Sequence, residues 1–186
     1  MTSSKDPAMP ETPSEQPAAL PFDLRDFRSA LGSFATGVTI CTTRGRDGEP
    51  VGLTVNSFAS VSLDPPLVLW SQSLYAQSLP AFQEASHFVV NVLAADQVAL
   101  ATRFAGDHDN RFLDVEHIVP EHGAPVIAGC AAHFECRNEA RYYGGDHIIF
   151  VGRVERYAHT PKPTLMFCRG RYMSGRPLEA IADEPE

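Results

Sequence analysis

The segment from residue 131 to residue 159 constrains the fold most strongly. Two strand-like runs, AAHFECRNEARYY and HIIFVGRVERYAH, flank the turn sequence Gly144-Gly145-Asp146. Alternation with a period of two and a short glycine-rich turn predict a long antiparallel hairpin. The double glycine permits the positive φ angles that such a tight turn requires.

Other segments add strands to this hairpin. β-branched residues over 38–43 predict a strand, and the turn cluster RGRDGEP should join it in a hairpin to a second, long strand over 51–63. The proline pair at 65–66 ends that strand, because proline removes a ladder donor. Further strands are expected over 67–71, which is apolar and expected to be central, over 87–93, and within 163–173.

Three short helices are predicted. The first, over 23–35, has Asp23 as its N-cap and one apolar face. The second covers 78–86 with Ser78 as its N-cap and Pro80 in its first turn, and the third covers 96–104. The apolar face of the first helix consists of Leu24, Phe27, Leu31 and Phe34.

This order of elements indicates the fold class. About six strands, mostly linked by hairpins, do not suit a doubly wound parallel sheet, which needs a helix between most strands. We therefore expect a mainly β chain, with a closed or partly closed antiparallel barrel and peripheral helices.

The chain of 186 residues suits one domain. Residues 1–20 are rich in Pro, Ser, Thr and Glu and are predicted to be a disordered tail, as is the acidic segment 177–186. The folded domain is expected over 21–176.

Charge and cysteine content bound the partners and the location. A formal charge of −8 with no basic run argues against a nucleic-acid partner. No apolar run approaches the roughly 18 residues that span a membrane, and the N-terminus lacks the apolar region of a secretory signal. The cysteines form no Cys-x-x-Cys pair, so reduced thiols in the cytoplasm are expected at Cys41, Cys130, Cys136 and Cys168.

The predicted strand over 51–63 has an unusually polar face. Alternation places Thr54, Asn56, Phe58, Ser60 and Ser62 on that face. A solvated strand face is one interpretation, although such a face usually carries Lys or Glu. The other is a binding surface, because small uncharged residues let a flat heteroaromatic ligand approach backbone N–H groups.

The segment SQSLYAQS, residues 71–78, leads into the second predicted helix. Free N–H groups at a helix start attract phosphate, and the hydroxyl and amide side chains ahead of it add donors. Simple capping by Ser78 is the alternative interpretation, and both stay open.

The hairpin turn itself carries Asp146 and His147. A histidine there could contact a cofactor or move a proton, whereas a plain turn with an exposed imidazole is the alternative. No metal site is predicted, because His133 and Glu135 lack the spacing of a zinc helix. Hydrolase-elbow, P-loop and dinucleotide fingerprints are also absent from the sequence.

Six segments in order resemble the flavin reductase family that serves two-component flavin monooxygenases, from about residue 22 to residue 175. They are FATGVTI (34–40), GLTVNSFASVSLDPPL (52–67), FVVNVL (88–93), ATRFA (101–105), GGDH (144–147) and FCRGRY (167–172). The resemblance implies a split β-barrel homodimer that binds FMN or FAD near the dimer interface. It also implies that NADH or NADPH is the co-substrate and that reduced flavin reaches a separate monooxygenase by transient or diffusive coupling.

The resemblance implies site residues as well. The isoalloxazine ring is expected against Val51, Gly52, Leu53, Thr54, Val55, Ser57 and Phe58, with Thr36 and Asn56 also in the flavin site. The ribityl phosphate is expected at Ser71, Gln77 and Ser78, and Arg103 and Phe104 complete the flavin site. The nicotinamide is expected at Gly145, Asp146 and His147, with His147 as a positioning group or proton donor.

One departure from the family bears on the function. Relatives often have a second hydroxyl or a basic residue where this chain has Ala76 and Gln77. We therefore expect the flavin to exchange freely as a co-substrate. Without a basic cluster for a 2′-phosphate, NADH is favoured over NADPH. Two alternatives stay open: a flavoprotein with tightly bound FMN that reduces a metal ion or corrinoid or carries electrons, and a non-catalytic module that binds flavin or haem.

Overall fold

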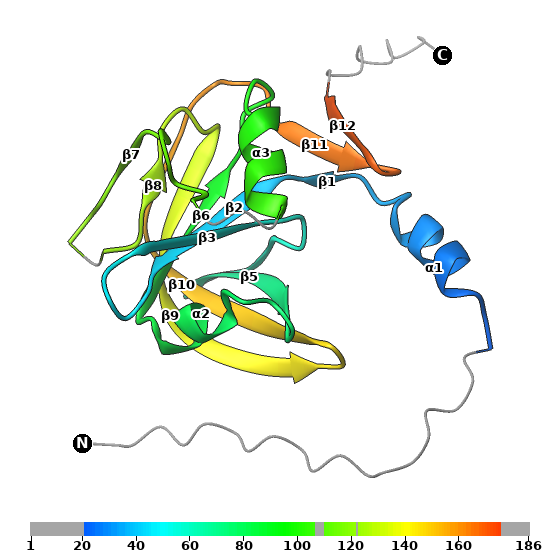
Figure 1. Cartoon of the computed structure of the whole chain (residues 1–186), viewed down its shortest axis with the longest axis horizontal. Helices are drawn as coiled ribbons and strands as arrows, with labels where there is room; N and C mark the ends of the chain where they lie inside the picture. Colours follow the sequence, from blue (N-terminus) through cyan, green and yellow to red (C-terminus); the bar gives the residue numbers. More distant parts are fainter. Residues whose placement is uncertain (1–20, 107–109, 122, 176–186) are drawn as a thin grey trace, which may run out of the picture.

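A computed structural model describes residues 21–106, 110–121 and 123–175. The predicted tails over 1–20 and 177–186 lie outside the described residues. Antiparallel strands form the body of the molecule (Figure 1). The described residues contain twelve strands, twice the expected number, because several are very short.

The main sheet has seven strands among the described residues. In spatial order they are β3 (Pro50–Val55), β2 (Thr39–Arg44), β6 (His87–Val92), β9 (Ala132–Gly144), β10 (His147–His159), β5 (Pro66–Ser73) and β4 (Ala59–Leu63). Smaller sheets pair β1 (Thr36–Gly37) with β11 (Leu165–Cys168) and β12 (Arg171–Ser174), and β7 (His117–Ile118) with β8 (Val126–Ile127).

The long hairpin is confirmed. β9 and β10 pair from His147 opposite Gly144 to His159 opposite Ala132, and Gly145 has a φ of 65° in the turn. Register shifts between Val151 and Gly152, and again after Val154, mark bulges. Bulges increase strand twist and bending, which lets the sheet curve (Figure 1).

The expected single strand over 51–63 is wrong. It is divided into β3 and β4, which lie at opposite ends of the strand order. The chain crosses between them at Asn56–Phe58, where the Ser57 hydroxyl bonds the backbone of Ser71 at 2.9 and 3.0 Å. Because the two ends of the sheet are joined by so short a connection, the sheet curls toward a barrel. The polar face is therefore interrupted at this crossing.

The strand over 67–71 is also not central. β5 lies between β10 and the terminal strand β4. Its burial alternates, with Val68, Trp70 and Gln72 buried and their neighbours partly exposed. One of its faces is therefore only partly covered by protein, as is common for an antiparallel sheet.

Two of the three predicted helices follow the expected signals. α1 (Leu24–Leu31) begins after Asp23, whose Oδ1 accepts hydrogen bonds from Arg25 N at 2.7 Å and Asp26 N at 2.9 Å. α3 (Val98–Ala105) ends before Gly106. The predicted N-cap of α1 is confirmed, and α3 ends within one residue of its expected end. The expected end of the first helix at residue 35 is wrong, because the helix already ends at Leu31, before Gly32.

The middle helix, α2 (Leu79–Glu84), differs in its start. Ser78 lies at the N-cap position, but its side chain makes no capping bond. Its backbone already has helical angles, φ −77° and ψ −6°, and its Oγ accepts a hydrogen bond from Gln72 Nε2 at 2.8 Å. The predicted capping role is therefore wrong, because a buried amide uses the hydroxyl oxygen.

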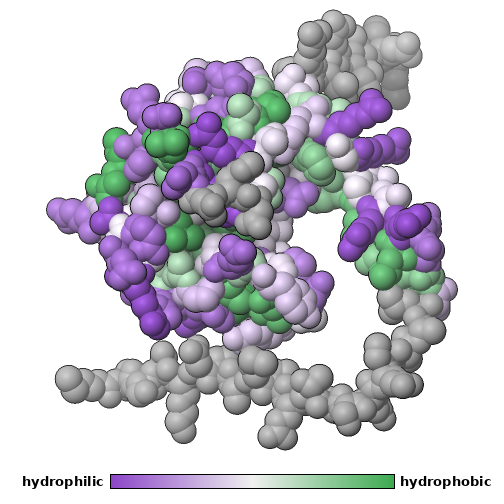
Figure 2. Space-filling view, in the orientation of Figure 1, coloured by the Kyte–Doolittle hydropathy of each residue, from purple (hydrophilic) through white to green (hydrophobic). Residues whose placement is uncertain are grey.

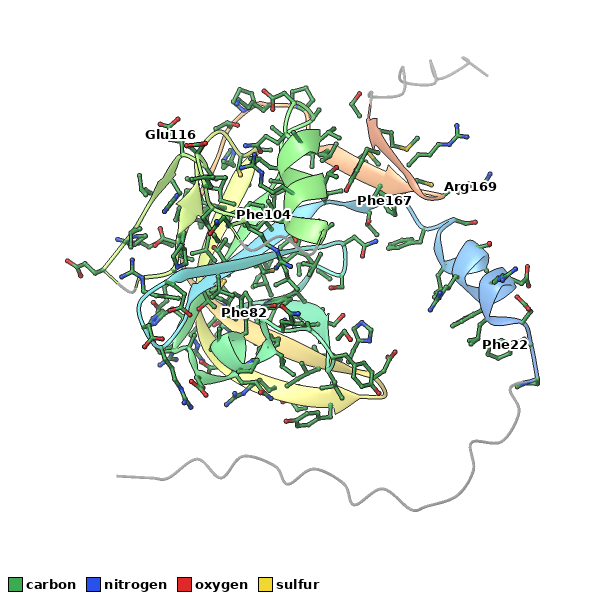
Figure 3. All side chains as sticks on the ribbon, viewed as in Figure 1. Phe22, Phe82, Phe104, Glu116, Phe167 and Arg169 are labelled. Atoms are coloured by element: carbon green, nitrogen blue, oxygen red, sulfur yellow. The ribbon has the colours of Figure 1, made fainter. Side chains whose placement is uncertain are left out.

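Three apolar clusters form the core of the described residues, and the smallest consists of Val89, Ala124 and Val126. The two larger clusters position the elements of the site. One surrounds Trp70, whose ring stacks on Phe150 with centroids 4.7 Å apart and meets Phe82 of α2 edge-on. The other lies beneath α3 and includes Phe104 and Leu165. Figure 3 labels Phe82 and Phe104, one in each of these two clusters. α3 packs on β2 and β3 and so fixes Phe104 over that end of the sheet.

α1 stands apart from the barrel (Figure 1). The predicted apolar face exists, but the chain itself does not bury it, and Phe34 lies beyond the helix end. Leu24, Phe27, Leu31 and Phe34 are between 45% and 78% exposed. Figure 2 shows apolar surface on the segment that contains α1. An exposed apolar stripe of this kind is typical of an interaction surface.

Candidate active site

A cavity of about 800 Å³ lies against β3, which is a typical volume for a small-molecule site. Its walls come from three parts of the chain: β3 with the turn before it, the turn before α2, and the end of α3 with the loop that follows. The lining residues are Glu49–Thr54, Tyr75–Ser78, Phe104–Gly106 and Asn110–Leu113.

The β3 wall offers backbone groups. β3 ends the strand order, so its second edge has no strand partner among the described residues. The Gly52 carbonyl on that edge accepts a hydrogen bond from Arg111 Nη1 at 2.9 Å. The N–H and C=O of one residue point to the same edge of an antiparallel strand, so the Gly52 N–H also faces away from β2.

Gly52 is required by sterics. A β-carbon at this position would lie 2.9 Å from Phe104 Cε1 and 3.2 Å from Phe112 Cζ. The two phenyl rings meet edge to face, with centroids 4.9 Å apart. An aromatic wall therefore lies directly on bare backbone, an arrangement that suits a flat ring system.

Thr54 holds α3 in place on β3. Its Oγ1 donates a hydrogen bond to the Ala101 carbonyl at 2.8 Å, so the hydroxyl proton of Thr54 is not available to a ligand. The hydroxyl that was expected to face a ligand instead positions the helix that carries Phe104.

The turn wall carries Ser78. Buried Gln72 donates to Ser78 Oγ, so the serine proton stays available to an acceptor in the cavity. Gln77 lines the same wall, and Tyr75 at the turn is 86% exposed. α2 has only six residues, so its dipole adds little to this wall.

The tip of the long hairpin lies beside the cavity without lining it. Leu74 N donates to the Asp146 carbonyl at 2.9 Å, which joins the tip to the turn that carries Tyr75. His147 Nδ1 lies 2.7 Å from Asp146 Oδ1. This hydrogen bond lowers the pKa of the Asp146 carboxyl. The contact fixes the orientation of the imidazole.

Comparison with known proteins identifies the chain. Residues 31–176 match the family described as flavin reductase like domain. The chain belongs to the flavin reductase family. The matched region includes every wall of the cavity and the hairpin tip.

Two named relatives and one solved structure show the range of this family. The FMN reductase (NADH) SmoA of Agrobacterium fabrum is 50% identical over 80% of this chain and 84% of its own length. The reductase component of the flavin-dependent trigonelline monooxygenase of Acinetobacter baylyi is 41% identical over 81% of this chain. That match spans only about half, 49%, of the Acinetobacter protein.

The structural match confirms the split β-barrel fold. The NADH:FAD oxidoreductase SgcE6 of Streptomyces globisporus superimposes with a TM-score of 0.79 and is 40% identical. The superposition covers 87% of this chain and 100% of that chain.

Seven of the expected flavin residues line the cavity of this flavin reductase: Val51, Gly52, Leu53, Thr54, Gln77, Ser78 and Phe104. Seven do not: Thr36, Val55, Asn56, Ser57, Phe58, Ser71 and Arg103. Val55 and Phe58 pack against the core, and the Phe58 ring stacks on Phe134 with centroids 5.5 Å apart. Ser57 and Ser71 bond each other at the strand crossing.

The remaining three residues have other surroundings. Asn56 is exposed in the crossing between β3 and β4. Thr36 lies in β1 opposite Phe167, and its Oγ1 is buried with no hydrogen-bond partner among the described residues. Arg103 Nη1 donates to the Leu113 carbonyl at 2.7 Å and so anchors the loop after α3 from outside the cavity.

Sequence reasoning missed the wall after α3. Asn110–Leu113 follow the helix in a polar stretch without periodicity, so nothing predicted that they return to β3. Neither a motif nor a periodic pattern marks Arg111 and Phe112 in this stretch, so the sequence held no signal for this wall. Glu49, Pro50, Tyr75, Ala76, Ala105 and Gly106 are further lining residues that were not predicted.

The described residues bring together no three His, Cys, Asp or Glu side chains that could hold a metal ion. Within the same residues, no helix is long and apolar enough to cross a membrane.

Proposed function

We propose that this chain is an NADH-dependent flavin reductase that binds FMN or FAD in the cavity against β3. The observation that carries the proposal is that one cavity combines the edge of β3, which has no strand partner among the described residues, with the Phe104–Phe112 wall. The relatives named FMN reductase (NADH) and NADH:FAD oxidoreductase support the same co-substrates.

The lining residues fit a flavin. Backbone groups of β3 suit the carbonyl and ring-nitrogen atoms of an isoalloxazine, and the phenyl rings supply apolar contact. Bound flavin supplies a hydride acceptor, so the protein needs neither a nucleophile nor a metal for the transfer. The task of these residues is to hold the ring still and exclude water.

The nicotinamide part of the proposal rests on Gly145, Asp146 and His147. The tip of the hairpin contacts the turn that carries Tyr75 at the cavity, so a nicotinamide held there would lie close to the flavin ring. His147 acts as a positioning residue, oriented by Asp146.

Exchangeable flavin and a separate monooxygenase complete the activity. The exposure of Tyr75 indicates a cavity that opens to solvent, which favours release of reduced flavin. The Acinetobacter relative is named as the reductase component of a monooxygenase, which supports coupling to a separate oxygenase.

A homodimer is part of the proposal. The exposed stripe of α1, with Phe27 and Leu31 at its centre, is continuous apolar surface that a second copy would bury. A cytoplasmic location is supported by the four cysteines, all of which are free thiols.

One assay tests the function. Purified protein is mixed with NADH or NADPH, with FMN, FAD or no flavin, and nicotinamide oxidation is followed in air. NADH oxidation only with added flavin supports the proposal. Oxidation without added flavin would show a tightly bound prosthetic group, and no oxidation under any condition would leave only a binding module.

A further inference from the structure

Tyr75 differs from the other aromatic residues that line the cavity. Phe104 is buried in the core, whereas the Tyr75 side chain is 86% exposed on the turn before α2. The turn therefore presents a large aromatic ring to solvent at the mouth of the cavity. We propose that Tyr75 is the stacking platform for the adenine ring of a bound dinucleotide, FAD or NADH. This proposal rests on the proposed function and adds a second aromatic subsite to it.

The backbone of the turn fixes the position of Tyr75. Ala76 N donates a hydrogen bond to the Ser73 carbonyl at 3.1 Å, and Tyr75 N donates one to Ser73 Oγ at 3.2 Å. Leu74 N donates to the Asp146 carbonyl at 2.9 Å, which ties the turn to the tip of the long hairpin. The backbone, rather than contacts of the ring, therefore keeps this side chain beside the cavity.

The Tyr75 ring itself is left open. Within residues 21–106, 110–121 and 123–175, it contacts no other aromatic ring, and its hydroxyl makes no hydrogen bond. Single exposed apolar residues are common on protein surfaces, but this one also borders a cavity of about 800 Å³. An open ring face at a cavity mouth suits stacking by a flat group of the ligand.

The exposure of Tyr75 favours adenine over the isoalloxazine as this flat group. The inner wall at Gly52, Phe104 and Phe112 suits the reacting ring, because hydride transfer needs a ring that is held still and sheltered from water. Tyr75 suits a group that takes no part in the transfer. FAD and NADH each carry such a group, an adenine joined through a pyrophosphate, whereas FMN has none.

The chemistry of the turn matches an uncharged base. Leu74–Ser78 carry no charged side chain, and stacking of a base on an aromatic ring needs none. Gln77 lines the same wall of the cavity. A glutamine amide can accept a hydrogen bond from the adenine N6 amine and donate one to N7. Tyr75 and Gln77 therefore offer a ring face and a hydrogen-bonding edge to the same group.

Two pairs of ligands test the proposal and separate the two sources of adenine. Dissociation constants are measured for FAD and for FMN, which lacks the adenylate part. KM is then measured for NADH and for reduced nicotinamide mononucleotide, which also lacks the adenylate part, with FMN as the flavin. The unmodified chain is compared with Tyr75→Ala, Tyr75→Phe and Tyr142→Ala. Tyr142 is a matched control, because it is a 59% exposed tyrosine that does not line the cavity.

Tyr75→Ala should weaken FAD binding, raise KM for NADH, or do both, by about fivefold to a hundredfold, the effect of losing one stacked base. The values for FMN and for the mononucleotide should change little. An effect on FAD alone assigns the site to the adenine of the flavin, and an effect on NADH alone assigns it to that of the nicotinamide co-substrate. Tyr75→Phe should keep the unmodified values, because it keeps the ring, and Tyr142→Ala should keep all four.

Any of four results would overturn the adenine site while leaving the proposed function intact. Unchanged values for FAD and NADH in Tyr75→Ala would show that no adenine stacks on this ring. Equal effects on ligands with and without adenine would place Tyr75 against another part of the ligand. A loss in Tyr75→Phe as large as in Tyr75→Ala would assign the effect to the hydroxyl, and the same selective loss in Tyr142→Ala would show an indirect effect. An unmodified chain that binds no flavin and oxidises no NADH would instead overturn the proposed function, and the adenine site with it.

Discussion

The edge of the Phe104 ring lies over the backbone of Gly52, so that a β-carbon added there would come within 2.9 Å of Phe104 Cε1. Phe104 is buried and belongs to the cluster beneath α3, so it has little room to move. One wall of the proposed flavin site therefore depends on the absence of a side chain.

Gly52→Ala should weaken flavin binding by about tenfold or more, because the new methyl group displaces Phe104 or Phe112 from the cavity wall. Flavin fluorescence quenching measures the change. Gly37→Ala is the control, since a β-carbon at Gly37 meets nothing within 4 Å. Equal affinities for the two variants would contradict this account of the wall.

Substitutions at Gln72 and Ser78 should affect the free energy of unfolding and the affinity for flavin to different extents. The amide of Gln72 donates to Ser78 Oγ, but its own Oε1 is buried without a partner among the described residues. Gln72→Met removes that unsatisfied acceptor, so unfolding free energy should change by less than about 1 kcal/mol. Flavin affinity should fall, because the Ser78 hydroxyl loses the group that orients it.

Ser78→Ala is the counterpart of this change. It leaves the Gln72 amide buried without its acceptor, which should lower the unfolding free energy by about 1–3 kcal/mol. Urea unfolding and flavin titration measure both variants. If Gln72→Met costs as much stability as Ser78→Ala, the amide has a structural role that the hydrogen bond does not explain.

His147→Ala should raise KM for NADH more than KM for the flavin, because the hairpin tip lies at the rim of the cavity rather than in its wall. Asp146→Asn should give a smaller change in the same direction, since it weakens the bond that orients the imidazole. Steady-state kinetics with each substrate varied in turn checks this. An unchanged KM for NADH in both variants would remove the tip from the nicotinamide site.

The contact between Asp146 and His147 should also be visible in the titration of the Asp146 carboxyl group. The hydrogen bond to His147 lowers the pKa of Asp146, so its carboxylate stays charged above its ordinary pKa of about 4 and the contact is lost only as pH falls below that range. His147→Ala should return the Asp146 pKa toward its ordinary value. NMR titration of the carboxyl group measures it, and an unchanged pKa would show that the contact does not form in solution.

Phe27→Glu with Leu31→Glu should convert the proposed dimer to a monomer, because each puts a charge on the apolar stripe of α1. Sedimentation velocity measures the state, and thermal unfolding checks that the barrel survives. Arg25→Glu, a charge change at a polar position of the same helix, is the control. A monomeric unmodified chain, or a double variant that stays dimeric, would show that this face has another use.

Local patterns predicted the parts of the fold that depend on neighbours in sequence. The hairpin around Gly145 has both of its arms and its turn in one segment, so its strands, partners and approximate register could be predicted. The capping of α1 by Asp23 is equally local. In contrast, the division of 51–63 depends on the Ser57–Ser71 bonds, which join residues of two separate segments.

The candidate site shows the same limit. Gly52, Ser78 and Phe104 were available from the family resemblance, and all three line one cavity. Arg111 was not, because its position depends on carbonyls at Gly52 and Gly106 that only the folded backbone brings near it. The packing of the partly buried Phe58 against the core likewise follows from the crossing between β3 and β4, which alternation along one strand does not reveal.

The free edge of β3 has a consequence for the colloidal behaviour of this protein. An unpaired strand edge is a template on which another chain can add a strand, and natural proteins protect such edges with charges or covering groups. Here Arg111 donates a hydrogen bond to the Gly52 carbonyl, and the Phe104 and Phe112 rings cover the adjacent backbone. A ligand on the same edge would block the rest, so cofactor-depleted preparations should aggregate sooner on storage than preparations kept in excess flavin.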